Sequence, residues 1–149
     1  MKRLTGFLSV WFAVVFSLLF AVSCRGGEDG SSSSASVGVK ATPTQVVKIT
    51  VSQEKAGVAG LTLKGYMDVL VGEGTLAYTE QSGMICSVNG LENDNVNWLY
   101  WMIYCNDADY TTTAYYVEYE GVRYDSALVG FSELPVKAGC TYLLAYHGF

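Results

Sequence analysis

Residues 97–105 form an apolar run in which every residue after Asn97 is apolar or aromatic and none is Gly, Pro or charged. A run of this length, rich in aromatic residues, predicts a central β-strand that is covered on both faces. Because side chains alternate along a strand, we expect the even-numbered residues from Trp98 to Tyr104 on one face and the odd-numbered residues from Leu99 to Cys105 on the other. One of the two faces should pack against a helix.

An amphipathic helix is predicted after the first strand of the domain. Residues 45–53 alternate apolar and polar side chains, which is the period of a strand with one solvated face. Thr62 then stands where a helix N-cap belongs, ahead of four apolar residues at helical spacing, which are Leu63, Tyr66, Met67 and Leu70. Gly72 and Gly74 are expected to end this helix.

Several short strands follow the predicted helix. They are expected at residues 75–78, 84–88, 114–119, 122–124 and 140–147, with turns at residues 89–90 and 120–121. The last of them is strongly apolar and should lie inside the sheet, because an exposed apolar edge strand invites aggregation. Residues 126–134 have no pattern that assigns them to a helix or a strand.

The order of these elements predicts the fold class. One strand, one helix and then several strands are typical of an α+β fold, here a β-grasp-like mixed sheet with one helix packed across a face. A β-sandwich is the main alternative, but sandwiches usually lack such a helix. The residues expected in the core are Leu63, Met67, Trp98, Trp101, Ile103 and Leu143.

The N-terminus has the pattern of a secretion signal. Lys2 and Arg3 precede an apolar stretch, and small residues stand before Cys24. Residues 1–23 resemble a bacterial lipoprotein signal peptide, with Ala21 in place of the usual Leu. We therefore expect a lipid on Cys24 that anchors the chain to the outer face of the bacterial cell membrane. Ordinary signal cleavage, which would release a soluble protein, is the alternative.

Composition divides the mature chain into a tether and one domain. Residues 24–44 are rich in Gly and Ser and contain no aromatic residue, so a flexible tether is expected there. All 11 tyrosines fall in residues 45–149, the predicted domain. The net charge is −5 for the whole chain and −7 once residues 1–23, with two basic residues and no acid, are removed. No basic patch is present, which argues against a nucleic-acid partner.

Residues that could carry catalysis or bind a metal are few. His147 is the single histidine and no Gly-x-Ser-x-Gly motif accompanies it. The cysteines lack the short spacing of zinc ligands, and residues 92–95 lack the spacing of a calcium loop. Four acids offer a carboxylate pair of the kind that cleaves glycosides, although solvated charge is the simpler interpretation: Asp107, Asp109, Glu118 and Glu120. We expect no enzyme and no metal site.

The redox state of the mature cysteines is left open by the sequence. If the central and terminal strands run antiparallel side by side, Cys105 comes near Cys140, and a disulfide between them is geometrically allowed. The alternative is three free thiols, with Cys86 buried as a small apolar residue in either case.

A family resemblance adds a functional expectation. The helix that begins at Thr62, the strand Tyr100-Trp101-Met102-Ile103-Tyr104 followed by Asn106-Asp107, the segment 126–131, and the closing Gly139-Cys140-Thr141-Tyr142 resemble a bacterial family of unknown function. That family is similar to the C-terminal domain of transcobalamin and intrinsic factor, the vertebrate cobalamin carriers. The resemblance covers residues 45–149 and implies a β-grasp-like extracellular module.

Two classes of function follow from these expectations. The first is a non-catalytic binding or interaction module at the cell surface, with a small ligand or a surface protein as its partner. The second is a receptor for cobalamin or a similar corrinoid, implied by the resemblance alone; the carriers have a further helical domain for which this chain has no room, so no ligand contact is assigned. A hydrolase is the weakest alternative.

Overall fold

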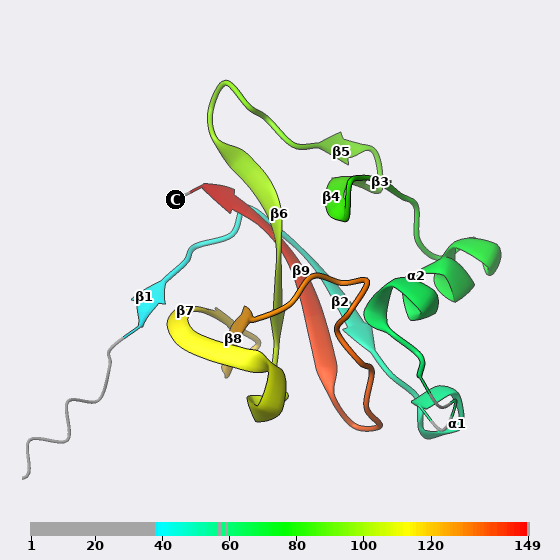
Figure 1. Ribbon diagram of the computed structural model, residues 1–149. Helices are drawn as coiled ribbons and strands as arrows, with labels where there is room; N and C mark the ends of the chain where they lie inside the picture. The colour runs from blue at the N-terminus through cyan, green and yellow to red at the C-terminus, as the bar shows by residue number, and fades with distance from the viewer. Residues whose placement is uncertain (1–37, 57, 59, 149) are drawn as a thin grey trace, which may run out of the picture. The chain divides into compact units, whose positions relative to one another are not determined.

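The computed structural model describes residues 38–56, 58 and 60–148 (Figure 1). Within these residues the chain forms two sheets and one main helix, so the predicted α+β class is confirmed. The predicted signal peptide and Cys24 lie outside the described residues.

The larger sheet has six strands within the described residues. Its spatial order is β1 (Val39–Lys40), β7 (Thr111–Tyr119), β8 (Val122–Ala127), β6 (Leu99–Cys105), β9 (Thr141–Gly148) and β2 (Gln45–Thr50). Neighbouring strands are antiparallel except for β1 and β7, which are parallel, so the sheet is mixed. The terminal strand β9 lies inside the sheet, between β6 and β2, as its apolar sequence predicts.

The smaller sheet is antiparallel and contains β3 (Tyr78–Gln81), β4 (Met84–Val88) and β5 (Leu91–Glu92). The predicted strand at residues 84–88 is β4, whereas the strand predicted at residues 75–78 begins only at Tyr78. Two-residue turns with positive φ join these strands, at residues 82–83 and 89–90. Gly at the second position of each turn accepts this conformation without steric cost.

Strand β6 is covered on both faces, as its sequence predicts. Trp101 and Cys105 belong to the core cluster that also contains residues of the main helix α2 (Leu63–Gly72). Tyr104 belongs to a second cluster on the opposite face, with Met102 packed against it. Alternation of side chains along the strand therefore divides its residues between two cores, one of which also contains residues of α2.

Helix α2 begins where the sequence predicts. The Thr62 side chain accepts a 3.3 Å hydrogen bond from the Gly65 amide, and the helix ends at Gly72. The amides of Leu63 and Lys64 donate to the carbonyls of Leu134 and Phe131. Residues 126–134, which had no pattern of their own, thus finish β8 and then satisfy amides at the first turn of the helix. Two further short helices are α1 (Gln53–Ala56) and the 3₁₀ helix η1 (Ala108–Tyr110).

The sheet begins before the predicted domain boundary at residue 45. Strand β1 lies in the stretch assigned to the tether, and the Ala41 and Thr44 amides donate to the carbonyls of Tyr116 and Tyr146. A Cβ atom at Gly38 would lie 1.9 Å from the Thr113 carbonyl oxygen, so only glycine permits this approach. The described part of the tether, residues 38–44, therefore belongs to the folded domain.

Trp98 is not a core residue, and this prediction was wrong. Its side chain is 68% exposed and its φ is +58°. The strand starts one residue later, because Asp94 and Leu99 exchange backbone hydrogen bonds that close a loop around Trp98. The other predicted core residues are placed as expected: Leu63, Met67, Trp101 and Leu143 are buried, and Ile103 is half-buried against the core.

Candidate functional site

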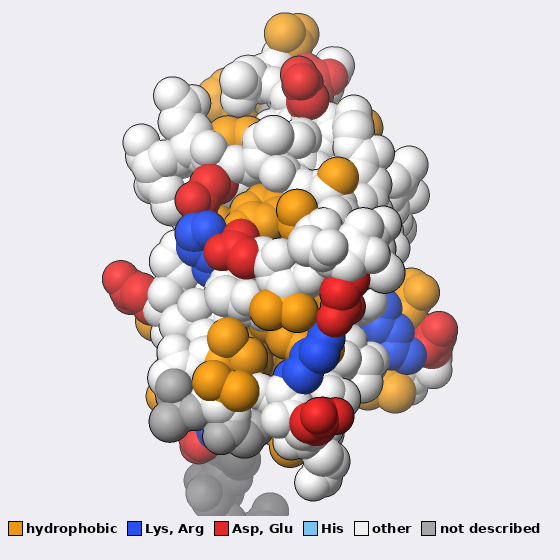
Figure 2. All heavy atoms as spheres, turned by 90° about the vertical axis from the view of Figure 1, so that its right-hand side faces the viewer, with side chains coloured by type: hydrophobic (Ala, Val, Ile, Leu, Met, Phe, Trp, Pro, Cys, Tyr) orange, Lys and Arg blue, Asp and Glu red, His pale blue; other side chains and the backbone are white. Residues whose placement is uncertain are grey.

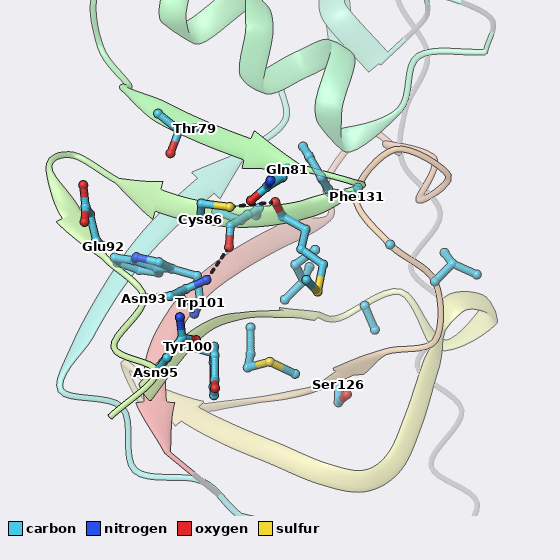
Figure 3. A pocket seen from close by; sticks show the side chains of 18 of the residues that line it. Thr79, Gln81, Cys86, Glu92, Asn93, Asn95, Tyr100, Trp101, Ser126 and Phe131 are labelled. Atoms are coloured by element: carbon cyan, nitrogen blue, oxygen red, sulfur yellow. Dashed lines mark hydrogen bonds between the residues drawn. The ribbon is translucent and has the colours of Figure 1, made fainter. Parts of the chain in front are cut away.

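A groove of about 760 Å³ lies between the three-stranded sheet and strand β6 (Figure 3). Three stretches line most of it, residues 83–86, 100–103 and 126–131, together with Thr79, Gln81, Glu92, Asn93 and Asn95. The first stretch lies at the start of β4, the second is the middle of β6, and the third leads out of β8.

The groove runs along strand edges instead of covering a sheet face. Four consecutive residues of β6, from Tyr100 to Ile103, all line it. Successive side chains of a strand point to opposite faces, so a cavity over one face would be lined by only two of the four. Consecutive residues 83–86 line the groove in the same way. The cavity therefore lies beside both strands, in the plane of their hydrogen-bonding edges.

Strand pairing explains why this space is open. Strand β8 pairs with β6 only at Tyr104 and Cys105, and β5 pairs with β4 only at Ser87 and Val88. Within the described residues, positions 99–103 of β6 and 84–86 of β4 have no strand partner on that side, and Leu99 makes only an isolated bridge to Asp94. Two short strand edges thus face each other across the groove.

Asn93 joins the two edges at one end of the groove. Its backbone amide donates to the Cys86 carbonyl and its Nδ2 donates to the Ile85 carbonyl, both at 2.8 Å. Its Oδ1 accepts a 2.9 Å hydrogen bond from the backbone amide of Trp101. Figure 3 shows the Asn93 side chain between β4 and the strand that carries Trp101. One side chain therefore bridges the small sheet and the large sheet.

Two glycines lie close together elsewhere along the groove. A Cβ atom at Gly130 would be 3.9 Å from the Gly83 carbonyl oxygen, which is ordinary van der Waals contact. Gly130 is exposed and, unlike Gly83, does not have a positive φ. A larger side chain at position 130 would therefore enter the space between residues 83 and 130 without straining the backbone.

The groove wall combines apolar and neutral polar side chains with one acid. Glu92 is the one carboxylate in the groove lining, which contains no Lys, Arg or His. The Glu92 backbone carbonyl accepts a 2.9 Å hydrogen bond from the Tyr146 hydroxyl. The Trp101 indole is fixed by a 2.8 Å hydrogen bond from Nε1 to the Leu91 carbonyl. The groove thus offers apolar surface, neutral polar side chains and strand backbone to a ligand.

The acids considered for catalysis are paired with lysines. Lys137 Nζ lies 2.9 Å from the buried Asp107 and 2.7 Å from Asp109, and its hydrogen bond lowers the pKa of Asp109. Each of the other two acids has its own lysine partner: Glu118 pairs with Lys40 and Glu120 with Lys48. The structure brings Asp107 and Asp109 together on one cation and places none of the four acids in the groove lining.

His147 is buried beside a tyrosine, and the three described cysteines are free thiols. His147 is 3% exposed, and its Nε2 is 2.8 Å from the Tyr104 hydroxyl. Cys86, Cys105 and Cys140 are free thiols, and burial raises the pKa of Cys105 and Cys140. Of the three, Cys86 lines the groove.

In the polar run at residues 92–95, the Asp94 carboxylate is hydrogen-bonded within its own loop. The Asp94 carboxylate accepts hydrogen bonds from the Val96 amide and from the backbone and side chain of Asn97, and these bonds lower its pKa. Among the residues that the structure describes, no group of three or more His, Cys, Asp or Glu could hold a metal ion. In the same part of the chain, no helix has the length and apolarity needed to span a bilayer.

Basic and acidic side chains are also mixed on the surface around α2. Figure 2 shows this face, where Lys and Arg lie beside Asp and Glu. Lys64 on α2 pairs with Asp68 at 3.0 Å and with Glu80 at 3.4 Å. This face therefore carries no large patch of one charge sign.

Comparison with known proteins identifies no relative: no family model, curated protein or solved structure matches the chain. Sequence reasoning assigned no ligand-binding residue, and it missed Asn93 and the facing glycines. The one available indication was the polar run at residues 92–95 directly before the most aromatic strand.

Proposed function

We propose that this chain is a non-catalytic binding module, held at the outer face of the bacterial cell membrane by a lipid on Cys24, and that the groove between β4 and β6 is its binding site. The observation that carries the proposal is the groove itself. Its volume of about 760 Å³ lies in the range of ligand sites, about 300–1,000 Å³. Its walls combine apolar side chains with a few polar groups, which is the usual composition of such sites.

The placement of the titratable groups supports binding over catalysis. A general acid or base must reach the substrate with a free proton site. Here Asp107 and Asp109 are engaged by Lys137, and His147 is buried against Tyr104. The ligand is therefore expected to leave the domain chemically unchanged.

The groove favours an uncharged, partly apolar ligand. A buried charge needs a partner, and the carboxylate of Glu92 is the one acidic group that the lining supplies. A corrinoid such as cobalamin, which the family resemblance implies, is one small-molecule candidate for the same groove.

The test is a fragment library screened by ligand-detected NMR against the chain without its signal peptide. The blocking variant is Gly130→Leu, and the matched control is Gly72→Leu, which adds the same side chain at an exposed helix end with no atom within 4 Å. Fragments should bind the parent and Gly72→Leu and lose binding to Gly130→Leu. Equal binding to all three proteins would show that the groove is not the site.

Cyanocobalamin is tested in parallel by its absorption spectrum. A spectral shift at micromolar protein that Gly130→Leu abolishes would assign the corrinoid to the groove. No shift, with fragments still binding, would remove the corrinoid and leave the binding module.

The anchor is tested separately by Cys24→Ala. The precursor and this variant are expressed in a bacterium and fractionated. The parent should be found in the membrane fraction and the variant outside it, because acylation needs the cysteine thiol. Equal release of both proteins would contradict the lipoprotein assignment.

A further inference from the structure

The backbone of β6 has a defined direction beside the groove. The Trp101 amide donates to the Asn93 side chain, and the Leu99 amide and carbonyl both bond to Asp94. In an antiparallel ladder, alternate residues direct their amide and carbonyl to opposite sides of the strand. The odd-numbered residues of β6 therefore direct these groups away from β9, toward the groove.

Part of this edge has no strand opposite it. Strand β8 reaches β6 at Tyr104 and Cys105, and Asn93 takes the Trp101 amide. Between them, the Trp101 carbonyl and the Ile103 amide face the groove, and within the described residues no strand pairs with β6 there on that side. The Trp101 carbonyl is an acceptor and the Ile103 amide is a donor, and they lie on the same strand edge with the spacing at which a neighbouring strand forms its hydrogen bonds.

We propose that the groove binds an extended polypeptide segment that adds as a short strand beside β6 and bonds to the Trp101 carbonyl and the Ile103 amide. This inference rests on the groove being the binding site, as proposed above, and it names the class of ligand. Strand addition to an open edge is a general mode of peptide recognition, in which main-chain hydrogen bonds supply affinity. Either strand direction satisfies both groups, because each places a donor opposite Trp101 and an acceptor opposite Ile103.

The chemistry of the edge supports a strand as the occupant. Proteins usually protect open edges with Lys, Pro or a covering element. Residues 99–105 contain neither Lys nor Pro, and the neighbouring strand β4 stands across a groove instead of covering the edge. The edge is therefore left competent to pair.

The side-chain specificity follows from the walls. Side chains of an added strand would alternate between the two faces of β6, where they meet Met102 on one side and Ile103 on the other. Both contacts are apolar. The segment is expected to carry apolar or neutral residues, with room for a basic one only near Glu92.

The experiment uses a phage-displayed heptapeptide library selected on the chain without its signal peptide. Selected peptides are synthesised unmodified and with a single N-methyl group at each backbone position in turn. Removal of the amide that meets the Trp101 carbonyl should weaken binding by about threefold to tenfold, while methylation of outward-facing amides should not. Gly130→Leu should lose the peptide and Gly72→Leu should retain it.

The second measurement is amide hydrogen exchange of the labelled domain. Bound peptide should slow exchange at Ile103 by at least about tenfold. Peptides that bind without protecting Ile103, or that bind Gly130→Leu equally well, would overturn the inference. Protection of Ile103 that grows with protein concentration without peptide would overturn it in favour of a second copy of the chain.

The outcomes separate this inference from the proposed function. If fragments bind the groove but no selected peptide does, the strand-pairing ligand is rejected and the binding module stands. If neither fragments nor peptides distinguish Gly130→Leu from Gly72→Leu, both proposals fall.

Discussion

The Asn93 side chain accepts a 2.9 Å hydrogen bond from the Trp101 amide and donates one of 2.8 Å to the Ile85 carbonyl. The two backbone groups belong to different sheets, so a single amide spans the separation between β4 and β6. An amide is suited to this position because it both accepts and donates. Neither a carboxylate nor an apolar side chain can make both bonds.

Asn93→Ala is therefore expected to destabilise the domain by about 1–3 kcal/mol, because two half-buried backbone groups lose their partner. Chemical denaturation measures the change. The control is Asn95→Ala, an exposed neighbour in the same polar run, which should change stability by less than about 0.5 kcal/mol. If both variants unfold at the same denaturant concentration, the bridge contributes nothing.

The two tryptophans of the β6 region should respond differently to truncation. Trp101 is 5% exposed, and its ring centroid lies 5.2 Å from that of Tyr146. Trp101→Ala should therefore lower the free energy of unfolding by about 3–5 kcal/mol. Trp98→Ala should change stability by less than about 0.5 kcal/mol because its side chain is exposed. Thermal melting of both variants checks the order.

A third variant tests the backbone at position 98. Since Trp98 has a φ of +58°, Trp98→Gly is expected to melt at least as high as Trp98→Ala, because glycine adopts this backbone conformation without steric cost. A Trp98→Ala protein that melts as low as Trp101→Ala would contradict the surface position of Trp98.

Sequence periodicity predicted the features that each element specifies locally. Alternation along residues 99–105 placed Trp101 and Tyr104 on opposite faces, and the helical spacing after Thr62 located α2. Both patterns depend on residues close together in the chain. The interior place of β9 followed from its apolar composition, since each of its faces contributes to a core cluster.

The groove could not be predicted from sequence periodicity, because it depends on where the pairing between strands β6 and β8 ends. That β8 leaves β6 after Tyr104 depends on how both strands fit their other neighbours. The prediction that Trp98 is a core residue was wrong for a related reason. The apolar pattern continues through Trp98, but backbone hydrogen bonds between Asp94 and Leu99 close a loop, and the strand begins at Leu99. Contacts of this kind override local pattern.

Alkaline pH should destabilise the domain through two buried tyrosines. Burial raises the pKa of Tyr104 and of Tyr142 to about 12, above the value of an unfolded tyrosine near 10. Between these values the unfolded chain has lost protons that the folded chain keeps, so stability present below about pH 10 is lost as pH rises toward 12. Each group steepens the loss by up to about 1.4 kcal/mol per pH unit.

The measurement is urea unfolding from pH 9 to 11.5, together with tyrosinate absorbance at each pH. Tyr104→Phe should reduce the pH dependence, because it removes one of the two tyrosines whose pKa burial raises. A stability that is independent of pH over this range would contradict the assignment.

The cysteines should remain thiols under oxidising conditions. Cys105 lies directly opposite Tyr142, so Cys140 is its diagonal neighbour and not its partner across the strands. Diagonal neighbours are about 7–8 Å apart, beyond the range of about 4.4–6.8 Å that a disulfide requires between Cα atoms. A chain of residues 24–149 with Cys24→Ala, alkylated after unfolding without reductant, should gain three alkyl groups by intact mass. A gain of one would show a disulfide.

Native alkylation gives an independent test of the same assignment. Only the thiolate reacts, and burial both shields Cys105 and raises its pKa. Cys86 is half-buried in the groove lining and should react well before Cys105 at pH 8. A selected peptide that fills the groove should slow the reaction at Cys86 and leave Cys140 unaffected, because Cys140 does not line the groove. Equal slowing of both would place the peptide elsewhere.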